Sequence, residues 1–166
     1  MSRQAKLNSM RLLESKQLAY TLHTFPDGIH SASGVAAALG IDPARVYKTL
    51  VGLTNEGRPV LVMLAAERSL DGKALARAIG VKRVAMASQA EAERLTGLKV
   101  GGISALALAH KRFATYLDAA ATQLAGASLL VSAGQRGMNL ELTVEALLQA
   151  TGARIVAAGV NRDQPS

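Results

Sequence analysis

Lys48 is a residue whose type and position together suggest chemistry, because it interrupts an apolar stretch. That stretch, VYKTLV at residues 46–51, has the composition of a β-strand. With a period of two, Lys48 shares one face with Val46 and Leu50, and the opposite face is also largely apolar. A partly buried ammonium group is costly unless an anion or a carbonyl oxygen contacts it. Lys48 is therefore a candidate ligand anchor; the alternative is a lysine that extends to solvent along the sheet edge.

Two adjacent glycines form a second candidate, in the stretch KVGGISAL at residues 99–106. Gly101 and Gly102 allow the backbone to come close to a ligand and to direct successive N–H groups at one oxygen atom. A plain turn uses the same residues, so this stretch indicates a site only in combination with others.

A third stretch, SAGQRGMNLEL at residues 132–142, joins two predicted strands through a glycine-containing loop. Arg136 in the loop could contact a phosphate, and Asn139 in the following strand could hydrogen-bond a polar group. The alternative interpretation is an ordinary glycine-rich hairpin.

The signatures of the common catalytic classes are absent from the sequence. There is no cysteine, which excludes disulfides, thiolate metal sites and a cysteine nucleophile supplied by the protein. There is also no G-x-S-x-G, no H-E-x-x-H and no P-loop. His23, His30 and His110 are too scattered to indicate a metal site. We expect no cofactor and no metal, so an enzyme of this sequence would act through positioning and main-chain donors.

The balance of charges points to a polyanionic partner. Lys and Arg number 19 against 12 Asp and Glu, a net charge of +7 that suggests nucleic acid as a partner, and a merely solvated basic surface is the equal alternative. Three Tyr, two Phe and no Trp offer few stacking platforms, so we expect contact with RNA phosphates and one RNA end. No apolar run approaches the roughly 20 residues that cross a bilayer, and no signal-peptide core is present. We therefore expect a cytoplasmic protein without a membrane partner.

Short helices and strands alternate along the chain, which predicts a single α/β domain over residues 1–166 with a disordered tail at 160–166. Hairpin turns such as NEGRP imply a mixed sheet instead of a purely parallel one. Ser88 and Glu91 have the spacing of a capping box, and Asp71 can cap the preceding helix. We predict helices at 8–17, 33–40, 72–80, 89–95, 118–125 and 144–151, and strands at 19–25, 46–51, 60–66, 81–87, 112–118, 128–134, 138–143 and 153–159.

The three stretches, in this order and at these spacings, resemble the YbaK/EbsC family of aminoacyl-tRNA deacylases, which is related to the editing domain of bacterial prolyl-tRNA synthetases. The resemblance also includes LLESKQLAYTLHTF, LGIDPARVYKTLV, AIGVKRVAMA and LLQATGA, and so covers nearly the whole chain. It implies a compact α/β domain with a mixed, mostly antiparallel, barrel-like sheet and surrounding short helices. It further implies a trans-acting enzyme that deacylates mischarged Cys-tRNA(Pro), and also Cys-tRNA(Cys).

The resemblance also implies a mechanism and a set of site residues. In that family the thiol of the substrate is thought to attack its own ester carbonyl, so the protein supplies geometry and oxyanion stabilisation but no nucleophile. The essential lysine of the family falls on Lys48, which would hold a carbonyl or the terminal nucleotide. The implied catalytic residues are Lys48, Gly101, Gly102 and Ser132. The implied substrate-binding residues are Phe25, His30, Ile103, Ser104, Gly134, Arg136, Gly137 and Asn139.

The expected partners are the acceptor end of an aminoacylated tRNA and, for discrimination between tRNAs, prolyl-tRNA synthetase. Basic residues near the three stretches could follow the phosphates of the acceptor stem, and a solvated basic face is the alternative for each of them. The candidate tRNA-binding residues are Arg45, Lys73, Arg77, Lys82, Arg83, Lys111 and Arg112.

Three positions depart from the family pattern and bear on substrate identity more than on the fold. A tyrosine of the family is Phe25 here, the proline of its GGISP loop is Ala105, and an aspartate of its last site strand is Asn139. The pocket is expected to be more neutral and the loop less rigid. Two alternatives follow: a deacylase for another small amino acid such as alanine on tRNA(Pro), and a non-catalytic relative that binds tRNA or the synthetase.

Overall fold

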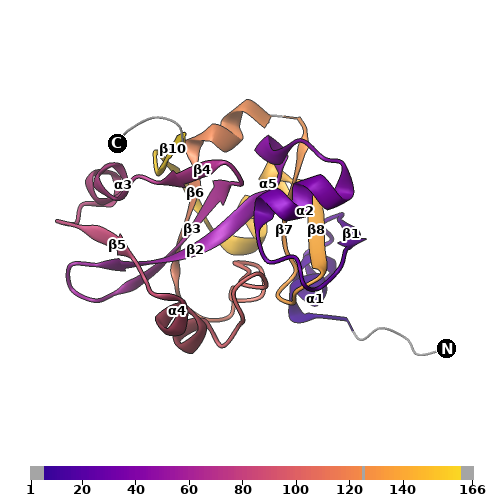
Figure 1. Cartoon of the computed structure of the whole chain (residues 1–166), viewed down its shortest axis with the longest axis horizontal. Coiled ribbons are helices and arrows are strands. Elements are labelled where there is room, and N and C mark those ends of the chain that lie inside the picture. The colour runs from indigo at the N-terminus through magenta and orange to yellow at the C-terminus, as the bar shows by residue number, and fades with distance from the viewer. Residues whose placement is uncertain (1–5, 125, 162–166) are drawn as a thin grey trace.

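The computed structural model describes residues 6–124 and 126–161, which alternate between short helices and short strands (Figure 1). The helices are α1 (Asn8–Ser15), α2 (Ala32–Leu39), α3 (Gly72–Ile79), α4 (Gln89–Thr96) and α5 (Val144–Thr151), with single-turn or irregular 3-10 segments η1 (Pro43–Arg45) and η2 (Ala119–Leu124). The strands are β1 (Thr21–Thr24), β2 (Tyr47–Thr54), β3 (Pro59–Ala65), β4 (Arg68–Leu70), β5 (Val84–Met86), β6 (Ala114–Asp118), β7 (Ser128–Ser132), β8 (Met138–Thr143), β9 (Arg154–Val156) and β10 (Gly159–Asn161).

A five-stranded sheet in the order β5-β2-β3-β6-β9 forms the centre of the fold. Its β2–β3 and β2–β5 pairs are antiparallel, whereas β3–β6 and β6–β9 are parallel. The predicted α/β class and mixed, mostly antiparallel pairing are confirmed. The predicted barrel-like closure is wrong, because the edge strands β5 and β9 have three residues each and pair with no further strand of the described chain.

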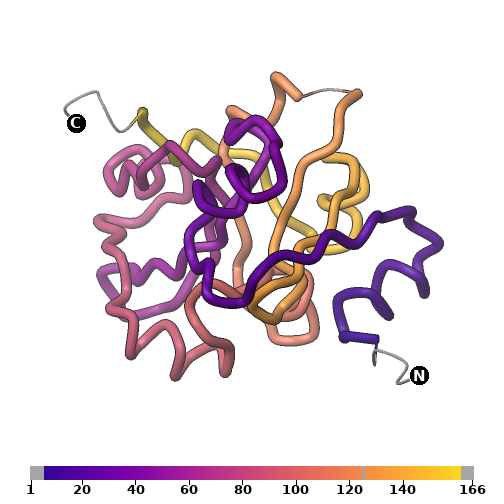
Figure 2. The backbone as a smooth tube through the Cα atoms, turned by 45° about the vertical axis from the view of Figure 1, so that its right-hand side comes forward, coloured from indigo at the N-terminus to yellow at the C-terminus, as the bar shows by residue number. Residues whose placement is uncertain are grey.

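A second, antiparallel sheet in the order β1-β8-β7 brings an early strand beside two late ones (Figure 2). Strict alternation along β7 and β8 sends leucine and valine side chains of one face into the main hydrophobic core. On the other face Leu130 packs with Val46 and Val35 under α2. This sheet therefore separates the main core from a smaller apolar cluster, and its polar residues on the α2 side are available to a site.

Local sequence signals explain where several helices begin. The Ser88 side chain accepts a hydrogen bond from Glu91 N–H at 3.1 Å, and the Glu91 carboxylate returns to Ser88 N–H, so the predicted capping box is confirmed. Asp71 caps α3 by accepting from Ala74 N–H, as predicted. None of the helices in the described part of the chain is long and apolar enough to cross a membrane.

The C-terminal strand was not foreseen. Val160 and Asn161, which were predicted to belong to a disordered tail, lie in β10 and pair with β4. The remainder of that predicted tail, 162–166, lies outside the described residues. Two three-residue strands carry too little pattern for recognition in the sequence, so β4 and β10 were both missed.

Candidate functional site

The free edge of β2 is the structural basis of the candidate site. Ala66 N–H donates to Val46 O at 2.8 Å, which sets the phase of the β2–β3 ladder. Even-numbered residues of β2 therefore direct their main-chain groups at β3, and odd-numbered residues direct theirs at the opposite edge. On that edge β5 pairs with Gly52–Thr54, and Ala87 N–H donates to Val51 O at 2.9 Å. At the start of β2 an isolated bridge joins Val46 to Leu130 of β7, so the part of the edge at Thr49 is the part that no strand of the described chain pairs with. An unpaired strand edge exposes N–H and C=O groups that can bind a ligand.

A cleft of about 420 Å³ lies along this edge, a size typical of small-molecule sites. It combines residues from β2, α2, the glycine loop and the β7–β8 sheet, which are far apart in the sequence. The lining residues are His30, Ser31, Ala32, Ser33, Val35, Val46, Tyr47, Lys48, Thr49, Leu50, Val51, Ala66, Met86, Ala87, Gln89, Ala92, Val100, Gly101, Ile103, Ser132 and Asn139.

Lys48 lines this cleft as the sequence suggested, and it is neither fully buried nor extended away from the site. Its Nζ donates to Ala66 O at 3.0 Å, in the turn that follows β3. An ammonium group has three N–H donors, so Lys48 can donate to the Ala66 carbonyl and to a ligand oxygen at the same time. The hydrogen bond to this carbonyl offsets part of the free-energy cost of partly burying a cation on an apolar strand.

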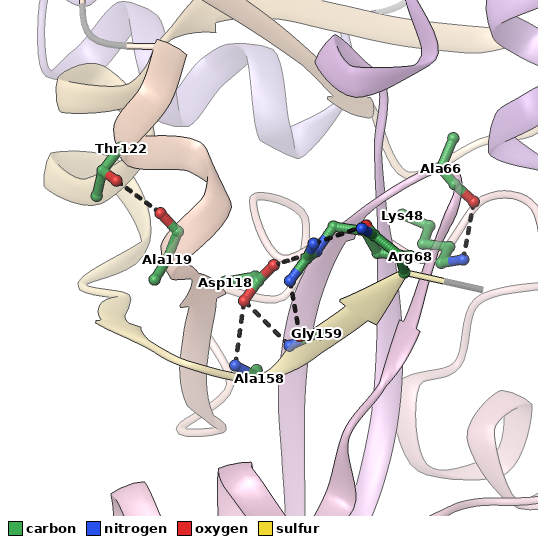
Figure 3. A network of polar contacts seen from close by, with 9 residues as sticks. Lys48, Ala66, Arg68, Asp118, Ala119, Thr122, Ala158 and Gly159 are labelled. Atoms are coloured by element: carbon green, nitrogen blue, oxygen red, sulfur yellow. Dashed lines mark hydrogen bonds and ion pairs between the residues drawn. The ribbon is translucent and has the colours of Figure 1, made fainter. Parts of the chain in front are cut away.

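The turn that presents Ala66 is anchored by a buried ion pair (Figure 3). Arg68 Nε lies 2.9 Å from Asp118 Oδ2, and the Asp118 side chain is only 2% exposed. Asp118 Oδ1 also accepts from Ala158 N–H at 3.1 Å and Gly159 N–H at 3.0 Å. The carboxylate thus ties β4 and β10 to the end of β6, and it anchors the turn whose Ala66 carbonyl accepts the hydrogen bond from Lys48.

Thr49 contributes a buried hydroxyl that the sequence analysis did not single out. Thr49 lines the cleft, and its Oγ1 is fully buried. Among the described residues, this Oγ1 is the one buried side-chain oxygen or nitrogen that has no hydrogen-bond partner. Such a group is costly to bury unless something pairs with it. The neighbouring Tyr47 is no candidate base, because burial raises the pKa of its hydroxyl to about 12.

Three predicted residues from other elements meet Lys48 at the cleft. Ser132 and Asn139 are Cα partners across the β7–β8 pair, and both face the cleft. The Ser132 hydroxyl accepts from Gly134 N–H at 3.1 Å, which leaves its own O–H available as a donor. His30, from the loop before α2, places its Nε2 3.0 Å from Asp27 O and also lines the cleft.

The two adjacent glycines have different roles. Gly101 lines the cleft with a φ of +93°, and an added Cβ would lie 3.0 Å from the Cβ of His30. Gly102 does not line the cleft, and its N–H donates to Lys99 O at 2.7 Å. Of the predicted pair of oxyanion donors, Gly102 N–H closes a turn, whereas Gly101 lies at the cleft; their catalytic role stays a prediction. Gly102 is required for close packing, since an added Cβ would lie 3.0 Å from Arg136 N.

Several residues that were predicted to bind substrate do not line the cleft. Ile103 does line it, as predicted. Ser104 is fully buried and caps the turn through Ala107 N–H. The other residues that do not line the cleft, and whose contact with substrate stays a prediction, are Phe25, which packs in the apolar cluster under α2; Gly134, which borders a separate groove; Gly137, whose carbonyl accepts from Phe25 N–H; and Arg136, whose Nε donates to Val100 O.

Arg45 forms an internal clamp, and its predicted contact with a tRNA phosphate stays a prediction. Its Nε donates to Ser128 O at 2.9 Å, and its Nη2 lies 3.1 Å from Glu141 Oε2. The Ser128 hydroxyl donates to the same carboxylate, and His23 Nε2 lies 2.8 Å from its other oxygen. The hydrogen bonds from Ser128 and His23 lower the pKa of Glu141. Arg45 thereby joins the start of β2 to the β1-β8-β7 sheet.

The other six basic candidates are exposed and remain predictions. They occupy three places: α3, the segment before β5 and the segment before β6. The residues are Lys73, Arg77, Lys82, Arg83, Lys111 and Arg112. No group of three or more His, Asp or Glu side chains with metal-binding geometry occurs in the part of the chain that the structure describes.

The cleft also contains residues that sequence reasoning missed. Ser31, Ser33 and Gln89 add polar groups, and Met86 is 52% exposed beside the cleft. Met86 could have been noticed as an exposed apolar residue only after its strand was known to be an edge strand. Thr49 carries a weak signal in the sequence, as a hydroxyl next to the lysine.

Comparison with known proteins decides the family. The model of the aminoacyl-tRNA editing domain matches residues 26–150, a range that contains the whole cleft lining. The chain belongs to the aminoacyl-tRNA editing domain family. A protein of Enterococcus faecalis, named as a candidate Cys-tRNA(Pro)/Cys-tRNA(Cys) deacylase, EbsC, is 39% identical over 89% of this chain and 90% of its own length. The resemblance to the YbaK/EbsC family is thus confirmed.

Two further relatives fit this assignment to the editing domain family. A proline–tRNA ligase of Aquifex aeolicus is 28% identical over 75 residues, which are 45% of this chain and 13% of the ligase. A crystal structure of a candidate trans-editing enzyme for prolyl-tRNA synthetase superposes with a TM-score of 0.75. That superposition covers 95% of this chain and all of the other, at 22% identity, and so it supports the fold alone.

Proposed function

We propose that this editing-domain protein is a trans-acting aminoacyl-tRNA deacylase whose leading substrate is mischarged Cys-tRNA(Pro), with Cys-tRNA(Cys) as a second substrate. One observation carries the proposal. Lys48, Gly101 and Ser132, which the resemblance assigned to catalysis, line a single cleft in a chain that is 39% identical to EbsC over most of both lengths.

The cleft offers donors to the ester that links the amino acid to the tRNA. The ester carbonyl gains negative charge when it is attacked, and preorganised N–H donors stabilise that charge. The Lys48 ammonium and the Gly101 N–H come from two different segments that line the cleft, and they are the donors we assign to this oxygen. Lys48 contributes a full charge and Gly101 a fixed dipole, so neither has to act as a nucleophile.

The nucleophile in this proposal is the thiol of the substrate. Its sulfur attacks the carbonyl carbon, the bond from that carbon to the ribose oxygen breaks, and the thiol proton ends on that oxygen. The products are a thiolactone and free tRNA. The Lys48 cation favours the thiolate, since a neighbouring positive charge lowers the pKa of a thiol. Holding the two groups of one substrate together is the main catalytic contribution of such a site.

The substrate side chain and α-amino group are assigned to the polar groups around Thr49. The buried Thr49 hydroxyl and the main-chain groups at the unpaired edge of β2 can hydrogen-bond an amino acid of small size. Asn139 provides both a donor and an acceptor where the family pattern has an aspartate. We assign the exposed Met86 at the cleft to contact with the terminal base.

The body of the tRNA would lie across the exposed basic residues of α3 and of the segments before β5 and β6. Contacts of this kind follow phosphates and carry little sequence information. Choice among tRNAs is therefore assigned to a partner, prolyl-tRNA synthetase, and the reaction to the cytoplasm. The similarity to a proline–tRNA ligase supports the choice of partner.

Deacylation of purified Cys-tRNA(Pro), Cys-tRNA(Cys), Ala-tRNA(Pro) and Pro-tRNA(Pro) tests this proposal. Release of cysteine from Cys-tRNA(Pro), with formation of the thiolactone, is the expected result. Release of alanine without release of cysteine would overturn the thiol mechanism and assign the protein to a sister specificity. Binding of tRNA without release of any amino acid would identify a non-catalytic relative. Addition of prolyl-tRNA synthetase should raise the preference for tRNA(Pro).

A further inference from the structure

The Val100 peptide groups are held from both sides by charged residues that do not line the cleft. Val100 N–H donates to Glu93 Oε2 at 2.8 Å, from α4. Val100 O accepts from Arg136 Nε at 2.8 Å, from the loop between β7 and β8. Both hydrogen bonds are charge-assisted and therefore stronger than those between neutral groups. The segment immediately before Gly101 is thus clamped between a helix and a hairpin loop.

Because the peptide bond is planar, the hydrogen bond at Val100 O also fixes the direction of the Gly101 N–H. No cis peptide bond occurs among the described residues, so the Val100 C=O and the Gly101 N–H point in opposite directions. Arg136 holds the carbonyl from outside the cleft, whereas Val100 and Gly101 both line the cleft. The Gly101 N–H is therefore directed away from Arg136 and toward the cleft side of the loop.

Of the two adjacent glycines, Gly101 is the one whose N–H is not used in the turn onto Lys99. Gly102 N–H closes a turn onto Lys99 O at 2.7 Å. At Gly101 the φ of +93° sets the loop in a conformation that other residues rarely adopt, next to His30. A cation on a carbonyl oxygen also draws electron density from the adjoining N–H, which strengthens that N–H as a donor.

We propose that Arg136 and Glu93 are positioning residues for Gly101 N–H, the main-chain oxyanion donor. Arg136 orients and polarises the Val100–Gly101 peptide through Val100 O, and Glu93 fixes the preceding Lys99–Val100 peptide through Val100 N–H. This inference rests on the proposed deacylase function and names its donor. Glu93 is ionised at neutral pH, because the Val100 N–H and then the nearby Lys99 and Arg136 lower its pKa. The two charges thus hold two consecutive peptide planes of the same loop, Glu93 the Lys99–Val100 plane and Arg136 the Val100–Gly101 plane.

The inference separates Arg136 from the phosphate-binding role that its sequence context suggested. A phosphate contact acts in binding, so its loss raises KM and reduces the dependence on salt. An oriented donor acts in the transition state, so its loss lowers kcat with little change in KM. The two roles therefore predict different kinetic consequences of the same substitution.

The test combines kinetics with an amide signal that does not depend on activity. Arg136→Gln removes the cation, Glu93→Gln removes the carboxylate charge at nearly constant shape, and Arg136→Lys restores a cation without the planar fork. Matched controls are Arg154→Gln and Glu56→Gln, which change the same charges at exposed positions. For each variant the Gly101 N–H chemical shift and hydrogen-exchange rate are measured without tRNA, and deacylation is measured with Cys-tRNA(Pro).

We expect Arg136→Gln to shift the Gly101 amide signal, to speed its exchange and to lower kcat about tenfold or more at nearly constant KM. Glu93→Gln should do the same to a smaller extent, Arg136→Lys should recover part of the rate, and both controls should match the wild type. An increased KM with unchanged kcat, or an unchanged Gly101 signal, would overturn the inference. A wild-type protein without deacylase activity would instead refute the proposed function, while the amide signal would still report on the orientation.

Discussion

Lys48 and Thr49 are consecutive residues of β2, and both line the cleft although their side chains lie on opposite faces of the strand. This arrangement is possible because the cleft follows the unpaired edge of β2 and so reaches both faces. A cation and a buried hydroxyl therefore lie on two sides of one backbone at the cleft. The predictions for these two residues differ accordingly.

Replacement of Lys48 by alanine should lower kcat/KM for Cys-tRNA(Pro) by about 100-fold or more, as loss of one oxyanion donor does in other enzymes. Lys48 is half-buried and donates to Ala66 O, a carbonyl in the turn that follows β3. We therefore expect Lys48→Ala to lower the free energy of unfolding only slightly. Steady-state deacylation and thermal unfolding measure the two effects. Lys16→Ala, at the exposed end of α1, is the control that should retain full activity. Full activity of Lys48→Ala would remove the lysine from the mechanism.

Thr49→Val should make the protein more stable and less active. The substitution keeps the shape of the side chain and removes a buried hydroxyl that has no partner within the described residues. Burial of an unsatisfied polar group costs about 1–3 kcal/mol, so the free energy of unfolding should rise by about 1 kcal/mol. Deacylation should slow, because the hydroxyl is assigned to the substrate. Urea unfolding and deacylation rates of the same preparation check both signs.

Thr96→Val is the matched control for this experiment. Thr96 is also buried, but its Oγ1 donates to Ala92 O at 2.7 Å. Removal of a satisfied hydroxyl should lower the free energy of unfolding by about 1 kcal/mol. If both variants lose stability, the Thr49 hydroxyl has a partner in solution, and its assignment to the substrate fails.

Signals that act over a few residues allowed correct prediction of much of the fold. The Ser88–Glu91 capping box, the Asp71 cap and the strand around Lys48 all depend on neighbours in sequence, and the structure confirms each. The position of Lys48 at a cleft was also predicted. The strands β4 and β10 were missed because three residues make no periodic pattern.

Features that depend on distant partners could not be predicted from the sequence. Whether the β2 edge is free depends on how far β5 extends along it. Arg136 looks like a phosphate ligand in its loop, and only the fold brings Val100 O within reach of its guanidinium. Gly102 reads like a main-chain donor until the turn onto Lys99 O is known. Arg45 likewise becomes a clamp only when β8 supplies Glu141.

Asp118→Asn should destabilise the fold and also weaken the site. The Asp118 carboxylate accepts from two main-chain N–H groups and pairs with Arg68, and an amide cannot keep all three contacts. Breaking a buried ion pair typically costs 3–5 kcal/mol, so we expect a loss of about 3 kcal/mol in the free energy of unfolding. The turn that carries Ala66 O should loosen, and the Lys48-dependent rate should fall.

Chemical denaturation and deacylation well below the melting temperature separate these two effects on Asp118→Asn. Glu67→Gln, an exposed change in the turn beside Ala66, is the control. A destabilised variant that deacylates at the wild-type rate while folded would show that the Arg68–Asp118 pair does not act on Lys48.

Glu141 should make the stability of the protein depend on acid pH. Hydrogen bonds from Ser128 and His23 lower the pKa of this carboxyl in the folded state below its ordinary 4.5. The unfolded chain then binds more protons than the folded one between the two pKa values, so stability rises with pH there. The contribution of Glu141 is complete above the unfolded pKa and is lost as the pH falls through the folded pKa. Because the carboxylate is partly exposed, the effect is screened and should be modest.

Unfolding by urea from pH 7 to pH 3 should show a difference between wild type and Glu141→Gln that shrinks as the pH falls below about 4.5. A difference that stays constant with pH would mean that shape, and not the charge of Glu141, holds Arg45 and the start of β2 in place.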